Sequence, residues 1–283
     1  MSHWQKLHHS FSPEMAEAIQ LMHQSTQFLP MFSHAYLERQ ADDSHNNLLW
    51  LEQAQGLASQ THNGYRWVLS YGQQRLALQQ NAQTVSVIEL IGQTYENILN
   101  RIQDALSTTG LDASAYKALN HFEIPDHPFN HGQAIQPLAA DMRQALARQR
   151  QNALYILASQ ATPYEHAQAV RIWPHHFDTG CYIPIRFDAG GQAVQSFSLG
   201  WAIPDEQIRE PYYYITHWNK GGQPSYDRLP ELSGGGRWNQ DGWTGAVLLL
   251  SDIIAAGGRQ REAVEAFMAS GIAASLELLK SVR

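Results

Sequence analysis

The sequence is poorest in cysteine and in long apolar runs. Cys181 is the one cysteine among 283 residues, which excludes an intrachain disulfide and every zinc site built on paired cysteines. No run approaches the roughly 20 apolar residues of a membrane-spanning helix. The first residues also lack the apolar core of a signal peptide. We therefore expect a cytoplasmic protein that has no membrane partner.

Basic residues are scarce as well. The chain has 19 Lys and Arg against 26 Asp and Glu, and its formal net charge is -7. Because no basic cluster offsets this balance, we do not expect nucleic acid as a partner. The hydrophobic content of 43% is enough for a sizeable core in one large domain or two smaller ones.

Known catalytic signatures are missing too. There is no His-Glu-x-x-His metal motif and no Gly-x-Ser-x-Gly nucleophile elbow. The loop at 221–241 contains three consecutive glycines at 234–236. It lacks the Gly-Lys-Ser/Thr ending and the strand–turn–helix context that a P-loop or a dinucleotide fingerprint needs. Its glycine and tryptophan content makes it a candidate lid.

Periodicity in the apolar residues predicts a mixture of helices and antiparallel strands. Ser12 and Pro13 are typical of a helix start, as the N-cap and the first helical residue. Residues 107–132 form a connector rich in Pro, His and Asn, which is either a linker or a functional loop. We expect helices over about 13–28 (resumed after Pro30 to about 40), 86–106, 137–160 and 260–279, and strands over 48–53, 65–71, 75–79, 179–187, 194–203, 211–218 and 244–250.

The same order of elements occurs twice along the chain, which predicts an α+β fold made of two similar helix–antiparallel β-meander–helix halves, an internal duplication. We place the first α+β half at 1–106, the connector loop at 107–132 and the second half at 133–283. We expect the two halves to pack as one globular unit.

A polar cluster enters the first strand of each half. Asp42-Asp43-Ser44-His45 opens the first, and His175-His176-Phe177-Asp178 opens the second. If the second cluster is extended, His176 and Asp178 share one face of a strand. A His and a carboxylate placed in this way bind a metal together, or the Asp orients the imidazole. A buried structural His–Asp pair and ordinary turn chemistry explain the same residues.

Aromatic residues dominate the strand predicted at 211–218. Alternation places Tyr212, Tyr214, Thr216 and Trp218 on one of its faces. Aromatic side chains on an exposed face stack on sugars or planar ligands, although strands also favour aromatic residues for their core.

Blocks of the sequence at 42–50, 124–128, 173–178, 210–214 and 242–247 resemble a family of uncharacterised bacterial proteins. They carry DDSH-type, WPHHFD and PYYY-type motifs and span most of the chain. The resemblance implies no activity and assigns no catalytic residue.

Three functional hypotheses remain open. The first is a small organic ligand held in a cleft between the two halves. The second is a hydrolase-like enzyme that depends on a divalent metal, the one cofactor the composition suggests. The third is a structural or interaction protein without an active site. The sequence leaves the ligand, the reaction and the oligomeric state open. The ligand-binding candidates are His45, His175, His176, Asp178, Trp218 and Trp238, and the metal candidates are His45, His176 and Asp178, followed by Asp43 and His127.

Overall fold

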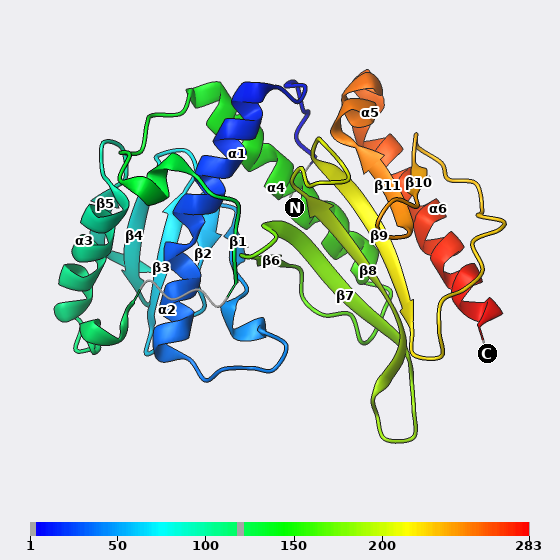
Figure 1. Cartoon of the computed structure of the whole chain (residues 1–283), viewed down its shortest axis with the longest axis horizontal. Coiled ribbons are helices and arrows are strands. Elements are labelled where there is room, and N and C mark those ends of the chain that lie inside the picture. The colour runs from blue at the N-terminus through cyan, green and yellow to red at the C-terminus, as the bar shows by residue number, and fades with distance from the viewer. Residues whose placement is uncertain (1–3, 118–121, 283) are drawn as a thin grey trace. The chain divides into compact units, whose positions relative to one another are not determined.

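Two antiparallel sheets flanked by helices give the chain an α+β fold (Figure 1). The computed structural model describes residues 4–117 and 122–282. The chain divides into two compact units. The β1–β5 unit comprises residues 12–147 and 171–177, and the β7–β11 unit comprises the chain up to Phe11, residues 148–170 and the chain from Asp178 onward. Within the described residues, no helix is long and apolar enough to cross a membrane.

The β1–β5 unit begins with two consecutive helices, α1 (Pro13–Thr26) and α2 (Phe28–Tyr36). The predicted N-cap is confirmed, because the Ser12 hydroxyl accepts a hydrogen bond from the Met15 amide at 3.3 Å. The break between the helices falls at Gln27. Pro30 lies in the first turn of α2, where its missing N–H interrupts no helical hydrogen bond.

Five strands follow in a sheet whose spatial order is the chain order, β1 to β5. One face of this sheet carries a continuous apolar layer, and α2 packs on β3 while α3 (Tyr95–Ser107) packs on β5. The strands are β1 (Leu49–Leu51), β2 (Gly56–Ala58), β3 (Tyr65–Ser70), β4 (Arg75–Gln80) and β5 (Gln83–Glu89).

The helix predicted over 86–106 is wrong in its first part. Residues up to Glu89 belong to β5, and helix α3 (Tyr95–Ser107) starts after the Thr94 N-cap. β-branched residues dominate the segment 84–88, and this composition favours a strand. Because Ile88 and Ile91 happen to continue the helical spacing of Ile98 and Ile102, periodicity alone does not separate the two elements.

The segment 107–132 carries two single-turn helices, η2 (Ala113–Ala115) and η3 (Pro128–His131), while residues 118–121 of the predicted connector lie outside the described residues. Helix α4 (Ala140–Ala161) follows. A boundary between the two units falls within α4, between residues 147 and 148. Two further boundaries lie directly before residue 171 and directly after residue 177. The two units are therefore interleaved along the sequence.

The short strand β6 (Arg171–Trp173) belongs to the β1–β5 unit. Its Ile172 exchanges both backbone hydrogen bonds with Leu48, at 2.8 and 3.0 Å. Leu48 lies three residues after the first polar cluster, and Ile172 lies three residues before the second. The backbone segments next to the two clusters therefore meet in this unit.

In the β7–β11 unit the strands follow the order β10–β11–β9–β8–β7. Because β11 lies between β9 and β10, this sheet departs from a simple meander. Three helical segments follow β11. The elements are β7 (Asp178–Phe187), β8 (Ala193–Ala202), β9 (Tyr212–Asn219), β10 (Arg237–Asn239), β11 (Gly245–Leu249), α5 (Leu250–Ala255), η4 (Gly257–Arg259) and α6 (Gln260–Ser281).

One face of this second sheet is buried against α6, which packs on β8, β9 and β11. Figure 1 shows α6 beside β10 and β11. Gly271 allows the close approach, because a Cβ there would lie 2.4 Å from Cδ1 of Ile215. The opposite face alternates with the buried one and carries half-buried polar and aromatic side chains. The buried face includes Cys181, Ile183, Phe197, Leu199, Trp201, Tyr213, Ile215 and Leu248.

The glycine-rich loop that the sequence suggests as a lid is attached to α6. A Cβ on Gly234 would lie 2.0 Å from the Ala263 carbonyl oxygen, and one on Gly236 would lie 2.4 Å from the Phe267 ring. The Ser233 amide also donates to the Ser270 hydroxyl at 2.9 Å. These glycines therefore serve close packing against the helix.

Candidate functional site

The second polar cluster forms a tight turn. The predicted extended conformation from residue 174 onward is wrong, because residues 174–177 turn and the Phe177 amide donates to the Trp173 carbonyl at 2.7 Å. Phe177 has the left-handed φ of 55°. Pro174 suits the turn, since it fixes φ and offers no N–H to a strand ladder. Strand β7 begins only at Asp178, so alternation does not place His176 and Asp178 on one face.

Helix α1 holds this turn in the β1–β5 unit. The Pro174 carbonyl accepts from His23 Nε2 at 2.8 Å and from Gln27 Nε2 at 3.0 Å. The His23 ring stacks on Phe177, with centroids 4.7 Å apart and planes 4° apart. His175 contacts the Trp173 ring, with centroids 6.1 Å apart, and His176 is exposed. These contacts hold the turn in place against helix α1.

The first polar cluster is also a turn. Asp43 has a φ of 57°, and Asp42 Oδ1 accepts from the Ser44 amide at 3.1 Å. Hydrogen bonds from the Ser44 side chain and backbone lower the pKa of Asp42. His45 is buried, its Nδ1 accepts from the Gln40 amide at 3.2 Å, and its ring contacts His34 edge-on. Asp42 and Ser44 thus form hydrogen bonds within the turn, as Asp and Ser residues commonly do at the start of a helix or turn.

His127 uses both of its ring nitrogens. Its Nδ1 accepts from the Phe129 amide at 3.1 Å and caps η3, and its Nε2 lies 3.2 Å from Glu17 Oε1. Its side chain is buried, whereas that of Glu17 is exposed. The hydrogen bond that caps η3 accounts for the position of the His127 ring.

No three His, Cys, Asp or Glu side chains of the described residues are grouped closely enough to hold a metal ion. Of the metal candidates, Asp43, His45, His127 and His176 belong to the β1–β5 unit, while Asp178 belongs to the β7–β11 unit.

Asp178 is paired with a tyrosine from β9. Tyr214 Oη donates to Asp178 Oδ2 at 2.5 Å, and burial together with this carboxylate raises the pKa of Tyr214 well above its ordinary value. The Tyr214 ring lies across Gly200, where a Cβ would meet the ring at 2.1 Å. Gly180 is the register partner of Gly200. Two glycines therefore leave the space that this aromatic ring fills.

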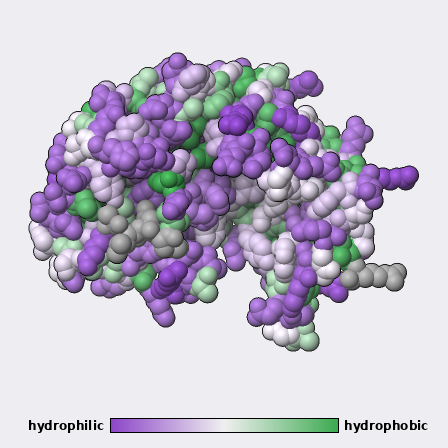
Figure 2. All heavy atoms as spheres, in the orientation of Figure 1, coloured by the Kyte–Doolittle hydropathy of each residue, from purple (hydrophilic) through white to green (hydrophobic). Residues whose placement is uncertain are grey.

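Beyond the glycine pair, the face of β7–β8–β9 opposite α6 becomes polar, and we call it the polar face. Register pairs place Tyr182, Ser198 and Thr216 side by side in one row across the three strands. The next row contains Ser196 and Trp218. Trp218 is 43% exposed, one of few large apolar side chains at this level among the described residues. Figure 2 shows pale, nearly neutral colours where β7 and β8 lie in Figure 1, as Gly, Ser, Thr, Tyr and Trp would give.

A hollow of about 350 Å³ lies on this polar face. Its size is at the lower end of the range of small-molecule sites. The small side chains of β8 form the floor of the hollow. Tyr182 on β7 and Trp218 on β9 lie on either side of this floor. The hollow is lined by Tyr182, Gln192, Ala193, Ser196, Phe197, Ser198, Thr216, His217 and Trp218.

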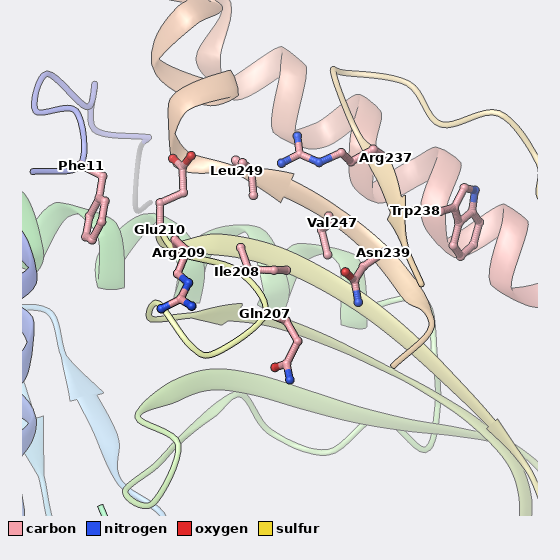
Figure 3. A pocket seen from close by; sticks show the side chains of 10 residues that line it. All are labelled: Phe11, Gln207, Ile208, Arg209, Glu210, Arg237, Trp238, Asn239, Val247 and Leu249. Atoms are coloured by element: carbon pink, nitrogen blue, oxygen red, sulfur yellow. The ribbon is translucent and has the colours of Figure 1, made fainter. Parts of the chain in front are cut away.

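A second hollow, of about 430 Å³, lies at the other edge of the same sheet, between β11, β10 and the loop before β9 (Figure 3). Trp238 contributes to its lining, but Figure 3 shows its ring turned away from Arg237 and Val247. The Trp238 indole N–H donates to the Pro230 carbonyl at 2.7 Å, so this ring holds the preceding loop.

Several lining residues of both hollows escape prediction from the sequence. Tyr182, Ser196 and Ser198 lie in strands that the sequence predicts, and a hairpin register drawn through the Gly190-Gly191 turn places Tyr182 opposite Ser198, with Ser196 in the next row. No comparable signal points to the charged residues of the second hollow, because they come from loops and a three-residue strand.

Fold and surface together define an α+β protein with two hollows on one sheet. Comparisons with protein-family models, with curated proteins and with solved structures gave no match. The resemblance to a family of uncharacterised bacterial proteins accordingly stays a prediction.

Proposed function

We propose that this protein binds a small organic ligand, containing a ring and hydroxyl groups, on the polar face of β7–β8–β9. The observation that carries the proposal is the exposure of Trp218, at 43%, beside a hollow whose floor is made of hydroxyl side chains. As in the hypothesis drawn from the sequence, the ligand is a small organic molecule and Trp218 is one of the residues that bind it. The proposal locates the site on one unit instead of in a cleft between two halves.

The chemistry of the lining supports this class of ligand. Tyr182 on β7 and Trp218 on β9 are separated by one strand and lie in neighbouring rows, two residues apart along the strands, which places their backbones about 12 Å apart. Since carbon atoms in contact lie about 3.5–4 Å apart, one ring fits between two aromatic walls at this spacing. Ser198 and Thr216 supply hydroxyls that both donate to and accept from a polar ring substituent.

The proposal is tested by screening a defined panel of monosaccharides, nucleosides and phenyl glycosides. Thermal shift is measured first, because a ligand that binds only the folded state raises the melting temperature. Calorimetric titration of any compound that shifts it follows. We expect Trp218→Ala to weaken binding at least about fivefold, since stacking on one aromatic ring is worth about 1–3 kcal/mol.

Phe187→Ala is the matched control, because Phe187 is an aromatic residue of β7 that is 39% exposed and lies outside the hollow. Circular dichroism of both variants checks that the fold is retained. If no compound in the panel stabilises the protein, or if Trp218→Ala binds as tightly as wild type, the proposal is wrong.

A further inference from the structure

Strand β5 ends the five-stranded sheet with an open edge. It pairs with β4 on one side, and no strand of the described residues lies on its other side. Figure 1 shows it at the end of the sheet, beside α3. Two other terminal strands are protected. Leu48, next to β1, pairs with Ile172, and β10 is only three residues long and carries the charged Arg237.

Apolar side chains gather along the β5 edge. Val85 is 51% exposed, Val87 38% and Ile91 41%, and they are three of the five exposed large apolar side chains of the described residues. The segment 83–91 contains no Lys, Arg or Pro, although Lys and Pro are residues with which proteins commonly protect an open edge. Glu89 is its single charge. An edge of this composition favours the addition of another strand.

The backbone of Val87 faces the open side of the sheet. The Leu90 amide donates to the Gln74 carbonyl at 3.1 Å, so Leu90 directs its backbone groups toward β4. Because residues of an antiparallel strand alternate in this respect, Val87 and Glu89 direct their N–H and C=O groups outward. The one register shift of the β4–β5 pair lies before residue 86, and residues 86–89 are regularly paired. These outward groups are therefore placed to form a further ladder.

An apolar row crosses one face of this sheet and ends at Val87. The strand registers align Ala58 on β2, Val68 on β3, Ala77 on β4 and Val87 on β5. Ala58 and Val68 are buried, whereas Val87 is the exposed end of the row. An added strand continues this row, and it covers Val87 best if the residue that it places opposite Val87 is apolar.

From these observations we infer that β5 is a self-association surface, to which a second copy of the chain adds its own β5 antiparallel about a twofold axis. Val87 of one copy lies opposite Val87 of the other, so their backbones exchange hydrogen bonds and the apolar row continues into the second sheet. In this register Glu89 lies beside Val85 of the other copy, and the two Glu89 residues are about 13 Å apart along the strands. A second copy thus supplies an apolar partner for Val87 and brings no like charge opposite Glu89. The inference is independent of the ligand site proposed beside Trp218.

Sedimentation equilibrium of the full chain across the micromolar range tests the association. We expect the mass to approach that of two chains as the concentration rises. Val87→Lys should weaken association at least about tenfold, because both copies lose an apolar contact and two ammonium groups then face each other. Phe187→Lys is the matched control, since Phe187 is 39% exposed and lies on β7, and it should associate as wild type does. Circular dichroism of both variants checks that the fold is retained.

Cysteine substitution tests the register. Directly opposite residues of a hydrogen-bonded pair have Cα atoms about 5.5 Å apart, within the range of a disulfide, so Val87→Cys should form a covalent dimer on oxidation. Val85→Cys is the matched control, because its two copies would lie about 13 Å apart along the strands. Cys181 is buried, so wild type should not cross-link.

Three results would each overturn the inference. The first is a wild-type mass of one chain throughout the micromolar range. The second is association of Val87→Lys as tight as that of wild type. The third is cross-linking of Val85→Cys as readily as Val87→Cys, which would show that the two strands do not meet about Val87.

Discussion

Single residues with an unusual backbone conformation or a buried side chain determine the conformation of the two polar clusters. Asp43 and Phe177 both adopt the left-handed conformation, which costs a residue other than glycine roughly 1–2 kcal/mol. Asp is one of the residues that tolerates this conformation, while Phe177 offsets the cost by burying its ring against His23. Neither positive φ is visible in the sequence, and for this reason the sequence pattern alone favours an extended second cluster.

His217 provides a prediction at the residue scale. It lies on the buried face of β9, its Nε2 is 3.2 Å from the Tyr226 hydroxyl, and burial lowers its pKa below the ordinary value of 6.5. Below pH 6.5 the unfolded chain takes up a proton that the native imidazole resists. Stability is therefore lost as pH falls through this value. His217→Gln should show a smaller fall in unfolding free energy between pH 7 and pH 5 than wild type, measured by urea denaturation.

The exposed histidine His8 is the control for this measurement. A His8→Gln variant should keep the wild-type dependence on pH. If His217→Gln and wild type lose the same free energy over this range, the buried imidazole does not contribute to acid sensitivity.

At the scale of elements, the sequence predicts strands best where apolar and polar residues alternate with a period of two. The strands predicted over 65–71, 75–79, 179–187, 194–203 and 211–218 all exist, with ends shifted by at most one residue. The sequence does not predict three-residue strands such as β2 and β6, because their pairing partners hold them in place and their own pattern is too short. The hollows depend on side chains from three or more elements, so their positions follow from strand register, which the sequence specifies only indirectly.

The attachment of the glycine-rich loop to α6 gives a prediction at this scale. Gly234 has a φ of 68° and would place a Cβ 2.0 Å from the Ala263 carbonyl oxygen, so Gly234→Ala combines backbone strain with a clash. We expect it to cost about 3 kcal/mol or more of unfolding free energy. Amide hydrogen exchange should accelerate at residues 232–236.

Gly191→Ala is the matched variant, because Gly191 has a similar φ of 77° and no atom within 4 Å of its added Cβ. It should cost only about 1–2 kcal/mol, the strain of the left-handed backbone alone. Equal losses in the two variants would show that the loop yields easily and is not held by the helix.

For the whole molecule, the decisive feature is that the two units are interleaved along the chain. The β1–β5 unit requires residues 171–177 as well as 12–147, and the β7–β11 unit requires residues from before Ser12 as well as from after Arg148. The sequence predicts the presence of two similar helix-and-sheet halves. It cannot show that each is completed by a segment from the other end of the chain.

Interleaving predicts that cutting the chain at the end of the predicted connector destroys both units. The fragments 1–132 and 133–283 should lack cooperative thermal unfolding when expressed separately, because the first loses the Leu48–Ile172 pairing and the second loses the chain up to Phe11. Circular dichroism melting of each fragment beside the full chain measures this. A cooperative transition in fragment 1–132 would contradict the interleaved division.

The ring of Tyr214 lying across Gly200 also has a consequence for how this protein varies over evolution. No side chain larger than hydrogen fits at position 200 while an aromatic ring occupies position 214. Substitutions at the two positions are therefore coupled, and a Gly200 replacement is tolerated only after position 214 has become small. Related sequences should show the two positions changing together, and Asp178 should lose its constraint wherever the tyrosine hydroxyl is gone.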